Sequence, residues 1–500
     1  MTSALRPGSP AARALAALVA SVLALAPPAA SAQVADNLPR LGDPAGEELS
    51  PQAERRLGES IMREIRRDPQ WLDDVELVDY LNRFAAPLAA APAAGGGGFE
   101  FFAVDATSIN AFALPGGFIG VHTGLLTAAE SESELAAVLA HEIGHVTQRH
   151  IARMLAQQKQ VSLVSMAAIV LSLLAARANP QAAMGGVMLG DQVARSNLLG
   201  FSRDAEREAD RVGFEILRQA GFDTQAIVSF FVRLQQAARF YESNAPSYVR
   251  THPLTTERIG DMQLRQRESR YRQRADSIEF QMLRARLKAL ADDTAEGRRN
   301  ARQIAEQQVR QSPRSTAAWY GLAAIASAQR DWSRADAALA QAQAQLGGTH
   351  PYLDSLAARG RLVAGDAAAA LERTRAGLAR FPDNRALARL HGEALVAAGR
   401  APDAVRHVEE QLLVWRSDPG LWALLGRAQL AAGRVADSHR AVAEQYLLQG
   451  SALGAVEQLR LAQRAGTTDF FTASVIDARL RELEPEARRE LEETRRAQQR

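Results

Sequence analysis

Residues 141–145 read His-Glu-Ile-Gly-His, and this stretch carries more chemical information than any other in the 500-residue chain. Two histidines four positions apart on a helix lie on one face, one turn above the other, and this spacing suits a single Zn²⁺. Glu142 lies beside them and can take a proton from a metal-bound water. The motif therefore predicts a zinc hydrolase, against the alternative of an amphipathic helix that carries two surface histidines.

The sequence before and through the motif predicts a helix. Ser131, with Glu134 three residues later, has the form of a capping box. Apolar residues follow at helical spacing, at Leu135, Val138, Leu139 and Val146. Gly144 interrupts this pattern, and a glycine in a helix costs roughly 1 kcal/mol relative to alanine. We therefore expect a packing reason at Gly144, namely the close approach of a neighbouring backbone.

A third metal ligand is predicted about sixty residues later in the chain. Residues 201–217 read FSRDAEREADRVGFEIL, in which Glu206 and Asp210 are four apart and share one helical face. Glu206 can supply the carboxylate of a His₂Glu site whose fourth position is open to water. Asp210 can accept a hydrogen bond that orients a ligand histidine. Glu208 is a rival ligand but points to a different face from Asp210, and the alternative for the whole segment is a solvated acidic face paired with arginines.

Four motifs in this order resemble one known family. HEIGH and the helix containing EADRVG are accompanied by INAFALPGGFIGVHTGLL at residues 109–126 and by THPLTTERI at residues 251–259. This set, over roughly residues 45–270, resembles the M48 peptidases, the gluzincin group related to the CAAX prenyl protease. The resemblance implies a mainly α-helical zinc peptidase domain with a small β-sheet.

The resemblance also implies roles for individual residues. It implies that one Zn²⁺ per chain is held by His141, His145 and Glu206. Glu142 is then the catalytic base. His252, in the THP motif, is expected either to stabilise the oxyanion or to occupy the open zinc position and hold the enzyme latent; the alternative is a loop histidine that caps a helix. His150 follows the second motif histidine by five positions, so it is expected to face away from the metal, at the surface.

The segment that precedes the motif helix predicts strands. Val104, Ile119 and Val121 lie in β-prone runs, and Pro115-Gly116-Gly117 marks a tight turn. A strand beside the zinc helix would offer an edge to which an extended peptide adds through main-chain hydrogen bonds. The alternative is an ordinary internal hairpin.

The N-terminus predicts secretion. Arg6 and Arg13 precede an apolar stretch, and Ala30-Ser31-Ala32 has the form of an A-x-A cleavage site, so residues 1–32 are expected to be a signal peptide. The chain has no cysteine, so a secreted form would be stabilised by its core and metal without disulfides. We expect the periplasm as the destination.

The charge balance and the hydropathy pattern limit the classes of partner that the chain is expected to bind. The chain has 59 basic and 57 acidic residues, and because two arginines lie within residues 1–32, the secreted chain would carry 57 of each. This balance offers no electrostatic footprint for nucleic acid. Residues 161–176 contain no charge, but a spanning helix needs about 20 apolar residues. We expect a buried helix or an apolar lid, with transient peripheral contact to a membrane or an unfolded client.

The C-terminal half predicts a repeat solenoid. Gly365, Gly399 and Gly433 recur at intervals of 34 residues, each between two helical segments, and the same period extended backwards reaches Asp331. A helix-turn-helix period of 34 is typical of tetratricopeptide repeats, which stack into a solenoid with a concave binding face. Trp422 begins a W-x₂-L-G pattern of the same kind. A generic helical bundle does not explain one fixed interval.

These observations divide the chain into a signal peptide (residues 1–32), a zinc peptidase domain (45–290), a repeat domain (298–480) and a polar C-terminal helix or tail (481–500), with the linker within residues 292–297. The combination resembles periplasmic M48 proteases of Gram-negative bacteria that carry such repeats. By that resemblance the clients are unfolded or misassembled proteins, above all outer-membrane proteins, and the partner is the barrel-assembly machinery. The alternative is a chaperone or assembly scaffold with a latent protease site.

Overall fold

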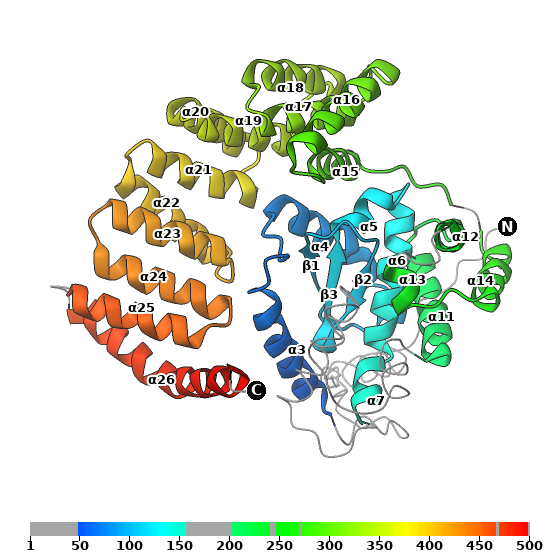
Figure 1. Cartoon of the computed structure of the whole chain (residues 1–500), viewed down its shortest axis with the longest axis horizontal. Coiled ribbons are helices and arrows are strands. Elements are labelled where there is room, and N and C mark those ends of the chain that lie inside the picture. Colours follow the sequence, from blue (N-terminus) through cyan, green and yellow to red (C-terminus); the bar gives the residue numbers. More distant parts are fainter. Residues whose placement is uncertain (1–48, 157–201, 241–246, 271, 467–469, 499–500) are drawn as a thin grey trace, which may run out of the picture. The chain divides into compact units, whose positions relative to one another are not determined.

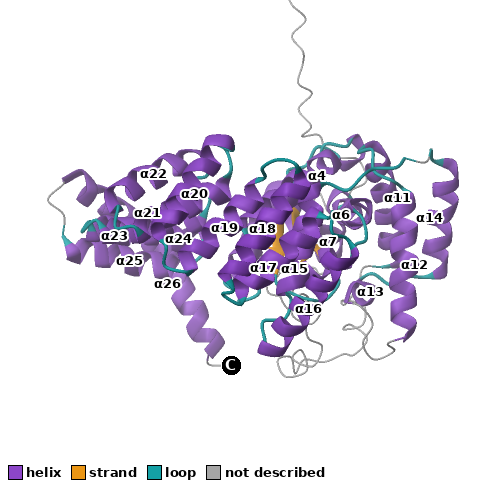
Figure 2. Cartoon of the chain, turned by 90° about the horizontal axis from the view of Figure 1, so that it is seen from above, coloured by secondary structure: helices purple, strands orange, loops and turns teal. Residues whose placement is uncertain are grey.

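The computed structural model describes residues 49–156, 202–240, 247–270, 272–466 and 470–498. These residues fall within one compact unit, Leu49–Arg500. Helices dominate it, and the described residues contain one small β-sheet (Figures 1 and 2). The expected fold class, mainly α with a small sheet followed by helical repeats, is confirmed.

The sheet has three strands in the order β1-β3-β2. They are β1 (Glu100–Val104), β2 (Ala111–Ala113) and β3 (Phe118–His122). β3 runs parallel to β1 and antiparallel to β2, with Ala111 opposite Val121. The predicted turn at Pro115–Gly117 is a short 3₁₀ segment, and Gly116 and Gly117 adopt φ of 76° and 89°, a region that favours glycine.

Helices surround this sheet in the first half of the chain (Figure 1). They are α3 (Pro51–Ile65), α4 (Val75–Ala89), α5 (Thr123–Ala128), α6 (Glu132–Thr147), α7 (His150–Ala156), α11 (Arg203–Gln219), α12 (Gln225–Phe240), α13 (Ser247–Thr251), α14 (Thr256–Glu268) and α15 (Ile278–Leu290), with a 3₁₀ turn η1 at Pro92–Ala94. Helix α6 carries the HEIGH motif and packs against β2, α4, α11 and α12.

The start of α6 agrees in part with the capping box predicted from the sequence. Ser131 is the N-cap and accepts a hydrogen bond from the Glu134 backbone N–H, as a capping box requires. The reciprocal bond differs, because the Glu134 carboxylate accepts from the backbone of Glu130 rather than from Ser131. From residue 132 to residue 145 every position of α6 is buried, so the alternative of an amphipathic helix with surface histidines is wrong.

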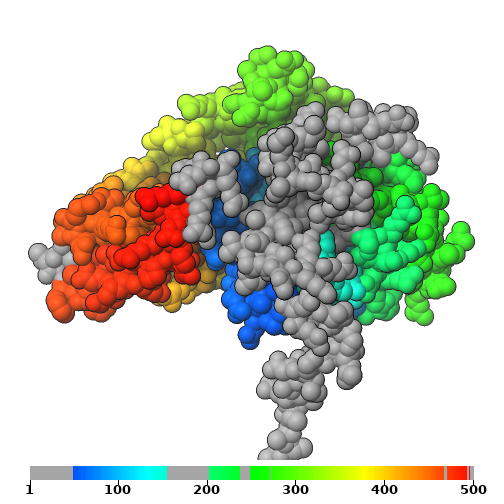
Figure 3. Space-filling model, turned by 60° about the horizontal axis from the view of Figure 1, so that its bottom comes forward, coloured from blue at the N-terminus to red at the C-terminus, as the bar shows by residue number. Residues whose placement is uncertain are grey.

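The second half is a series of antiparallel helices. They are α16 (Ala295–Gln311), α17 (Thr316–Ala328), α18 (Trp332–Leu346), α19 (Pro351–Val363), α20 (Ala367–Arg380), α21 (Arg385–Ala397), α22 (Ala401–Val414), α23 (Pro419–Ala431), α24 (Val435–Leu448), α25 (Ala452–Ala465) and α26 (Phe470–Gln498). The last of these pack against one another in chain order and form the orange-to-red part of the surface in Figure 3. α26 begins well before residue 481 and buries Ile476, Leu480 and Leu483, so it is amphipathic rather than wholly polar.

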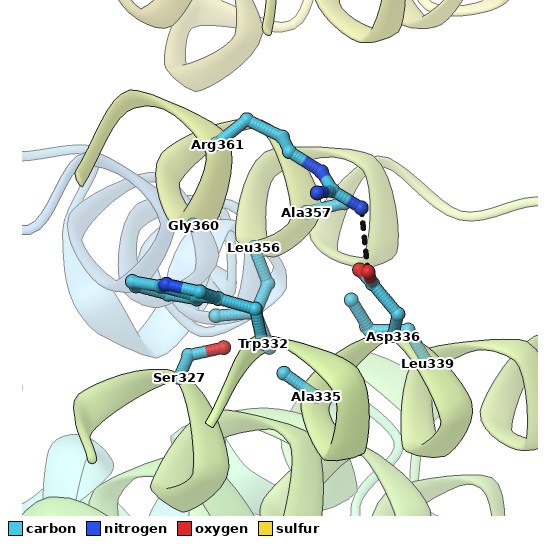
Figure 4. Close-up of a pocket in the computed structure, with 9 residues that line it drawn as sticks. All are labelled: Ser327, Trp332, Ala335, Asp336, Leu339, Leu356, Ala357, Gly360 and Arg361. Carbon is cyan, nitrogen blue, oxygen red and sulfur yellow. Dashed lines mark hydrogen bonds and ion pairs between the residues drawn. The ribbon is translucent and has the colours of Figure 1, made fainter. Parts of the chain in front are cut away.

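The three repeat glycines share one conformation. Gly365, Gly399 and Gly433 each end a helix with φ between 71° and 81°, the left-handed region in which a side chain is strained. The fourth turn uses Arg330 at φ 59°, one residue before the Asp331 that the period reaches. Within the first repeats, Trp332 lies beside Gly360 in a small pocket, and Arg361 pairs with Asp336 across it (Figure 4).

Helix α15 joins the two halves, because it packs against α4 and α5 on one side and against α16 and α17 on the other. Its Arg286 is buried and binds two carboxylates of the α4 region, Asp74 at 2.6 Å and Glu76 at 2.5 Å. One hydrophobic cluster extends from Leu77 to Ala357 across this junction. The division at residues 292–297 therefore stays a prediction about sequence organisation, while the core itself is continuous.

Two predictions concern residues outside the described ranges: the signal peptide at residues 1–32 and the apolar segment 161–176. Among the described residues, no helix combines the length and the apolar character needed to cross a bilayer.

Candidate metal centre

Four buried side chains converge in the interior of the first half. One ligand atom from each of His141, His145, Glu206 and His252 can be chosen so that all four lie within 4.8 Å of one another. The two Nε2 atoms of His141 and His145 are 3.0 Å apart, and the Glu206 carboxylate lies 3.4 and 3.5 Å from them. His252 Nδ1 lies 2.9 Å from Glu206 Oε1 and 3.4 Å from His141 Nε2. The structure thus brings together the three predicted ligands and the predicted extra histidine.

Two glycines permit this convergence. A Cβ atom on Gly144 would lie 2.9 Å from the carbonyl oxygen of Ala209 in α11. On the opposite side of the contact, a Cβ on Gly213 would lie 3.0 Å from the backbone of Ala140 and His141. The backbones of α6 and α11 therefore touch where the histidines and Glu206 must meet. The expectation of a close backbone approach at Gly144 is confirmed.

Asp210 and Arg258 support the cluster from one side. Asp210, one turn beyond Glu206 in α11, places Oδ1 3.0 Å from His141 Nδ1, on the ring edge away from the other ligands. Arg258 donates to both oxygens of Asp210, at 2.6 and 2.7 Å, and also lies 2.8 Å from Glu206. Arg258 is part of the THPLTTERI stretch, but no spacing or motif in the sequence distinguishes it from a surface arginine. The buried acids are thus paired, and the solvated-face alternative is wrong for Glu206 and Asp210.

Burial and charge set the protonation of the ligands. Burial lowers the pKa of His145 well below its ordinary value, and the neighbouring His141 lowers it further. Burial also lowers the pKa of His141, but Asp210 and Glu206 outweigh burial and raise it to about 9. Burial raises the pKa of Glu206, yet the surrounding histidines outweigh it and hold that pKa well below the ordinary value. The cluster is therefore a carboxylate among imidazoles that compete for positive charge.

This donor set fits a divalent metal. Three imidazoles and one carboxylate, all at most 1% exposed, face one another. Desolvated lone pairs in such a group are costly unless a cation or proton lies among them. Nitrogen and oxygen ligands of this kind, in a set of four, are those that zinc prefers.

Glu142 and Tyr248 complete the centre. Glu142 is buried, and its Oε1 lies 3.5 Å from His252 Nε2. Tyr248, which the sequence analysis missed, stacks on the His252 ring with centroids 4.7 Å apart. Burial, followed by the Glu142 carboxylate, raises the pKa of Tyr248, so its hydroxyl keeps its proton. No motif in the sequence separates this tyrosine from an ordinary core residue.

His150 is where the sequence expectation is wrong. The ring is buried, at 4% exposure, and its Nδ1 lies 2.8 Å from His145 Nδ1. Five residues along a continuous helix would place the two histidines on different faces. The helix is not continuous: α6 ends at Thr147, and Arg149 adopts φ 52° before α7 begins. This break returns His150 towards the motif. Glu208, considered as a rival ligand, contacts His150 and not the cluster.

Comparison with known proteins finds one family that matches part of this chain. Residues 74–266 match the family described as Peptidase family M48. A protein of Vibrio cholerae with the name putative beta-barrel assembly-enhancing protease is 38% identical over 250 residues, which are 50% of this chain and 51% of that protein. The beta-barrel assembly-enhancing protease of Escherichia coli K12 is 35% identical over 257 residues, 51% of this chain and 53% of that protein.

A more distant match is the mitochondrial metalloendopeptidase OMA1 of Schizosaccharomyces pombe, 35% identical over 162 residues, 32% of this chain and 44% of that protein. The chain spans about half the length of the bacterial relatives it matches.

Proposed function

We propose, from the match of residues 74–266 to peptidase family M48, that the chain is a zinc-dependent metalloendopeptidase of the periplasm. Its substrates would be misfolded or misassembled envelope proteins, above all outer-membrane proteins. The observation that carries the proposal is the buried convergence of His141, His145, Glu206 and His252 within 4.8 Å. The names of the bacterial relatives support the choice of clients.

The metal would be one Zn²⁺ held by His141, His145 and Glu206. When bound, zinc polarises the scissile carbonyl and lowers the pKa of its water to about 7. The chain's own residues supply the rest. Asp210 fixes the orientation of His141 through Nδ1. Arg258 pairs with the carboxylate of the ligand Glu206 and with that of Asp210, which lies behind His141.

Glu142 would move the proton. Its carboxylate is buried next to His141 in α6, on the side of the cluster that His252 faces. A desolvated carboxylate there can accept a proton from the attacking water and return it to the nitrogen of the leaving amine. Tyr248, fully buried on the same side, limits the entry of bulk water during this transfer.

His252 would control access. Its Nδ1 lies at hydrogen-bond distance from Glu206 and near His141, among the ligand atoms themselves. In that position it takes the place in which water would bind, so we propose that the described arrangement is the latent form. A rotation of His252 out of the cluster would open the fourth position and leave the ring where it can stabilise the oxyanion.

Substrate binding would use the edge of the sheet. β2 is the outer strand of the order β1-β3-β2 and packs against α6. An extended peptide can add to such an edge through main-chain hydrogen bonds, which read backbone rather than sequence. This mode of binding suits a protease whose substrates have in common only that they are unfolded. The helical repeats would hold the client or the barrel-assembly machinery on their concave face.

A second candidate is a chaperone or assembly scaffold whose protease site stays latent, and the position of His252 favours it. The variant Glu142→Gln separates the two. We expect the wild type to contain zinc and to cleave an unfolded substrate such as casein, and Glu142→Gln to retain zinc while cleavage falls by roughly 10²–10⁴-fold, the contribution of a general base. Cleavage that survives in Glu142→Gln would contradict the protease proposal. Zinc without cleavage in the wild type, together with intact assembly activity, would support the scaffold.

The ligand assignment needs its own measurement. Glu206→Ala should lose most of its zinc by metal analysis after dialysis, because one of the protein ligands is removed. Unchanged zinc occupancy would contradict Glu206 as a ligand.

A further inference from the structure

We propose that His150 and Glu208 form a positioning relay for the metal ligand His145, which would make His150 a further functional residue of the site. This inference rests on the proposed function, since it assumes that His145 binds the metal. His150 touches neither substrate nor metal; it acts through the ligand. Three contacts in series run from the cluster towards the surface.

The first contact joins the two imidazoles. His145 Nε2 faces the cluster, 3.0 Å from His141 Nε2, while His145 Nδ1 lies 2.8 Å from His150 Nδ1. The second contact joins His150 Nε2 to Glu208 Oε2 at 3.1 Å. The third joins Glu208 Oε2 to Arg153 at 2.7 Å. His150 is 4% exposed, whereas the Glu208 side chain is 40% exposed, so the relay ends at the protein surface.

These contacts allow one arrangement of protons. A neutral histidine that offers the Nε2 lone pair to a metal carries its proton on Nδ1. His145 must then donate from Nδ1, and the atom that receives this bond, His150 Nδ1, must be the unprotonated nitrogen of its ring. The proton of His150 therefore lies on Nε2, from which it donates to the Glu208 carboxylate. Each member fixes the tautomer of the one before it.

The backbone is shaped to make the first contact. Arg149, with φ 52°, is one of two residues other than glycine with positive φ in the described chain. This left-handed region is strained for a residue that carries a side chain. Arg149 is held there by Glu54, 3.0 Å from its Nε, and by the carbonyl of Leu49. This strained backbone conformation turns His150 back towards His145.

The two ligand histidines are thus supported in different ways. His141 Nδ1 directly faces the buried Asp210 carboxylate, whose Oδ1 lies 3.0 Å away. His145 reaches its carboxylate, Glu208, only through a second imidazole. Removing such a partner typically weakens metal affinity by about 10–100-fold, and the relay predicts an effect of that size at His150.

The test compares an acceptor with an apolar side chain at residue 150. We would measure zinc affinity by competition with a chromophoric chelator for wild type, His150→Gln and His150→Leu. The glutamine carbonyl can accept the His145 Nδ1–H bond, so His150→Gln should retain most of the affinity. His150→Leu should bind zinc about 10–100-fold more weakly. Equal loss in both variants would indicate packing alone, and undiminished affinity in His150→Leu would overturn the relay.

Glu208 provides a second test that does not disturb a buried ring. Glu208→Ala should weaken zinc affinity and Glu208→Gln, which keeps an acceptor, should weaken it less. Glu215→Ala is the matched control, because Glu215 also lies on α11 and pairs with an arginine on the exposed side. It should leave affinity unchanged. Equal affinity in Glu208→Ala and wild type would overturn the role of Glu208. If the wild type binds no zinc, both the proposed function and the relay are wrong. If the wild type binds zinc and substitutions at residue 150 leave the affinity unchanged, only the relay is wrong.

Discussion

Replacing Gly144 by alanine should weaken both folding and metal binding. In an exposed helix interior this change stabilises by about 1 kcal/mol. At Gly144, however, the new Cβ would lie 2.9 Å from the carbonyl oxygen and 3.2 Å from the Cα of Ala209, where 3.4–4 Å is ordinary contact. The obstacle is backbone, so α6 and α11 must separate by several tenths of an ångström.

The magnitude follows from two opposing terms. Overpacking of this kind costs about 1–3 kcal/mol, and subtracting the propensity gain leaves a net loss of up to about 2 kcal/mol. Metal affinity should suffer more, because α11 carries Glu206 and metal–ligand distances tolerate only about ±0.2 Å. We therefore expect Gly144→Ala to lose zinc affinity even under conditions in which it is fully folded.

Gly260→Ala is the matched control for this experiment. Gly260 also lies inside a helix, α14, and a Cβ there would meet nothing within 4 Å. It should gain stability by up to about 1 kcal/mol. Urea unfolding with chelator present, and zinc titration of the folded proteins, would measure both effects. If Gly144→Ala gains stability as Gly260→Ala does and binds zinc normally, the backbone contact does not set the geometry of the site.

Three further predictions concern other parts of the fold. Arg286→Met should lower the unfolding free energy by about 3–5 kcal/mol, because it leaves the buried Glu76 and the partly buried Asp74 without the Arg286 cation; a loss below that range in urea unfolding would contradict a strong pairing role. Burial lowers the pKa of His122 to about 4, so this residue contributes stability that is complete above its unfolded pKa of about 6.5 and is lost as the pH falls towards 4, by roughly 3 kcal/mol. His122→Gln should reduce the difference in stability between pH 7 and pH 4.5, and an unchanged difference would contradict this. Gly433→Ala should cost about 1–2 kcal/mol for the left-handed turn, and a thermal midpoint equal to the wild type would show that the turn relaxes.

The local features of the site could be predicted from the sequence. Helical periodicity places His141 with His145, and Glu206 with Asp210, on common faces, because neighbouring dihedral angles determine which side chains align. The Ser131 cap and the Pro115–Gly117 turn follow from the same short-range rules.

Features that depend on distant contacts could not be predicted. His150 was expected at the surface because the helix was expected to continue, and only the contacts of Arg149 with Glu54 and Leu49 explain why it breaks. Tyr248 and Arg258 carry no signal that distinguishes them from other core and surface residues. Each acquires a role only when burial removes water and leaves a specific partner.

The sequence by itself therefore determined which residues can share a helix face, where turns require glycine, and that the chain carries a metal-type motif followed by repeats. The tertiary structure decided which of these faces meet. It brought Glu206 and His252 to His141 and His145 across 61 to 111 residues of chain. The physical reason is that periodicity is a property of adjacent residues, whereas the meeting of α6 and α11 depends on burial summed over the whole core and on two glycines that let their backbones touch.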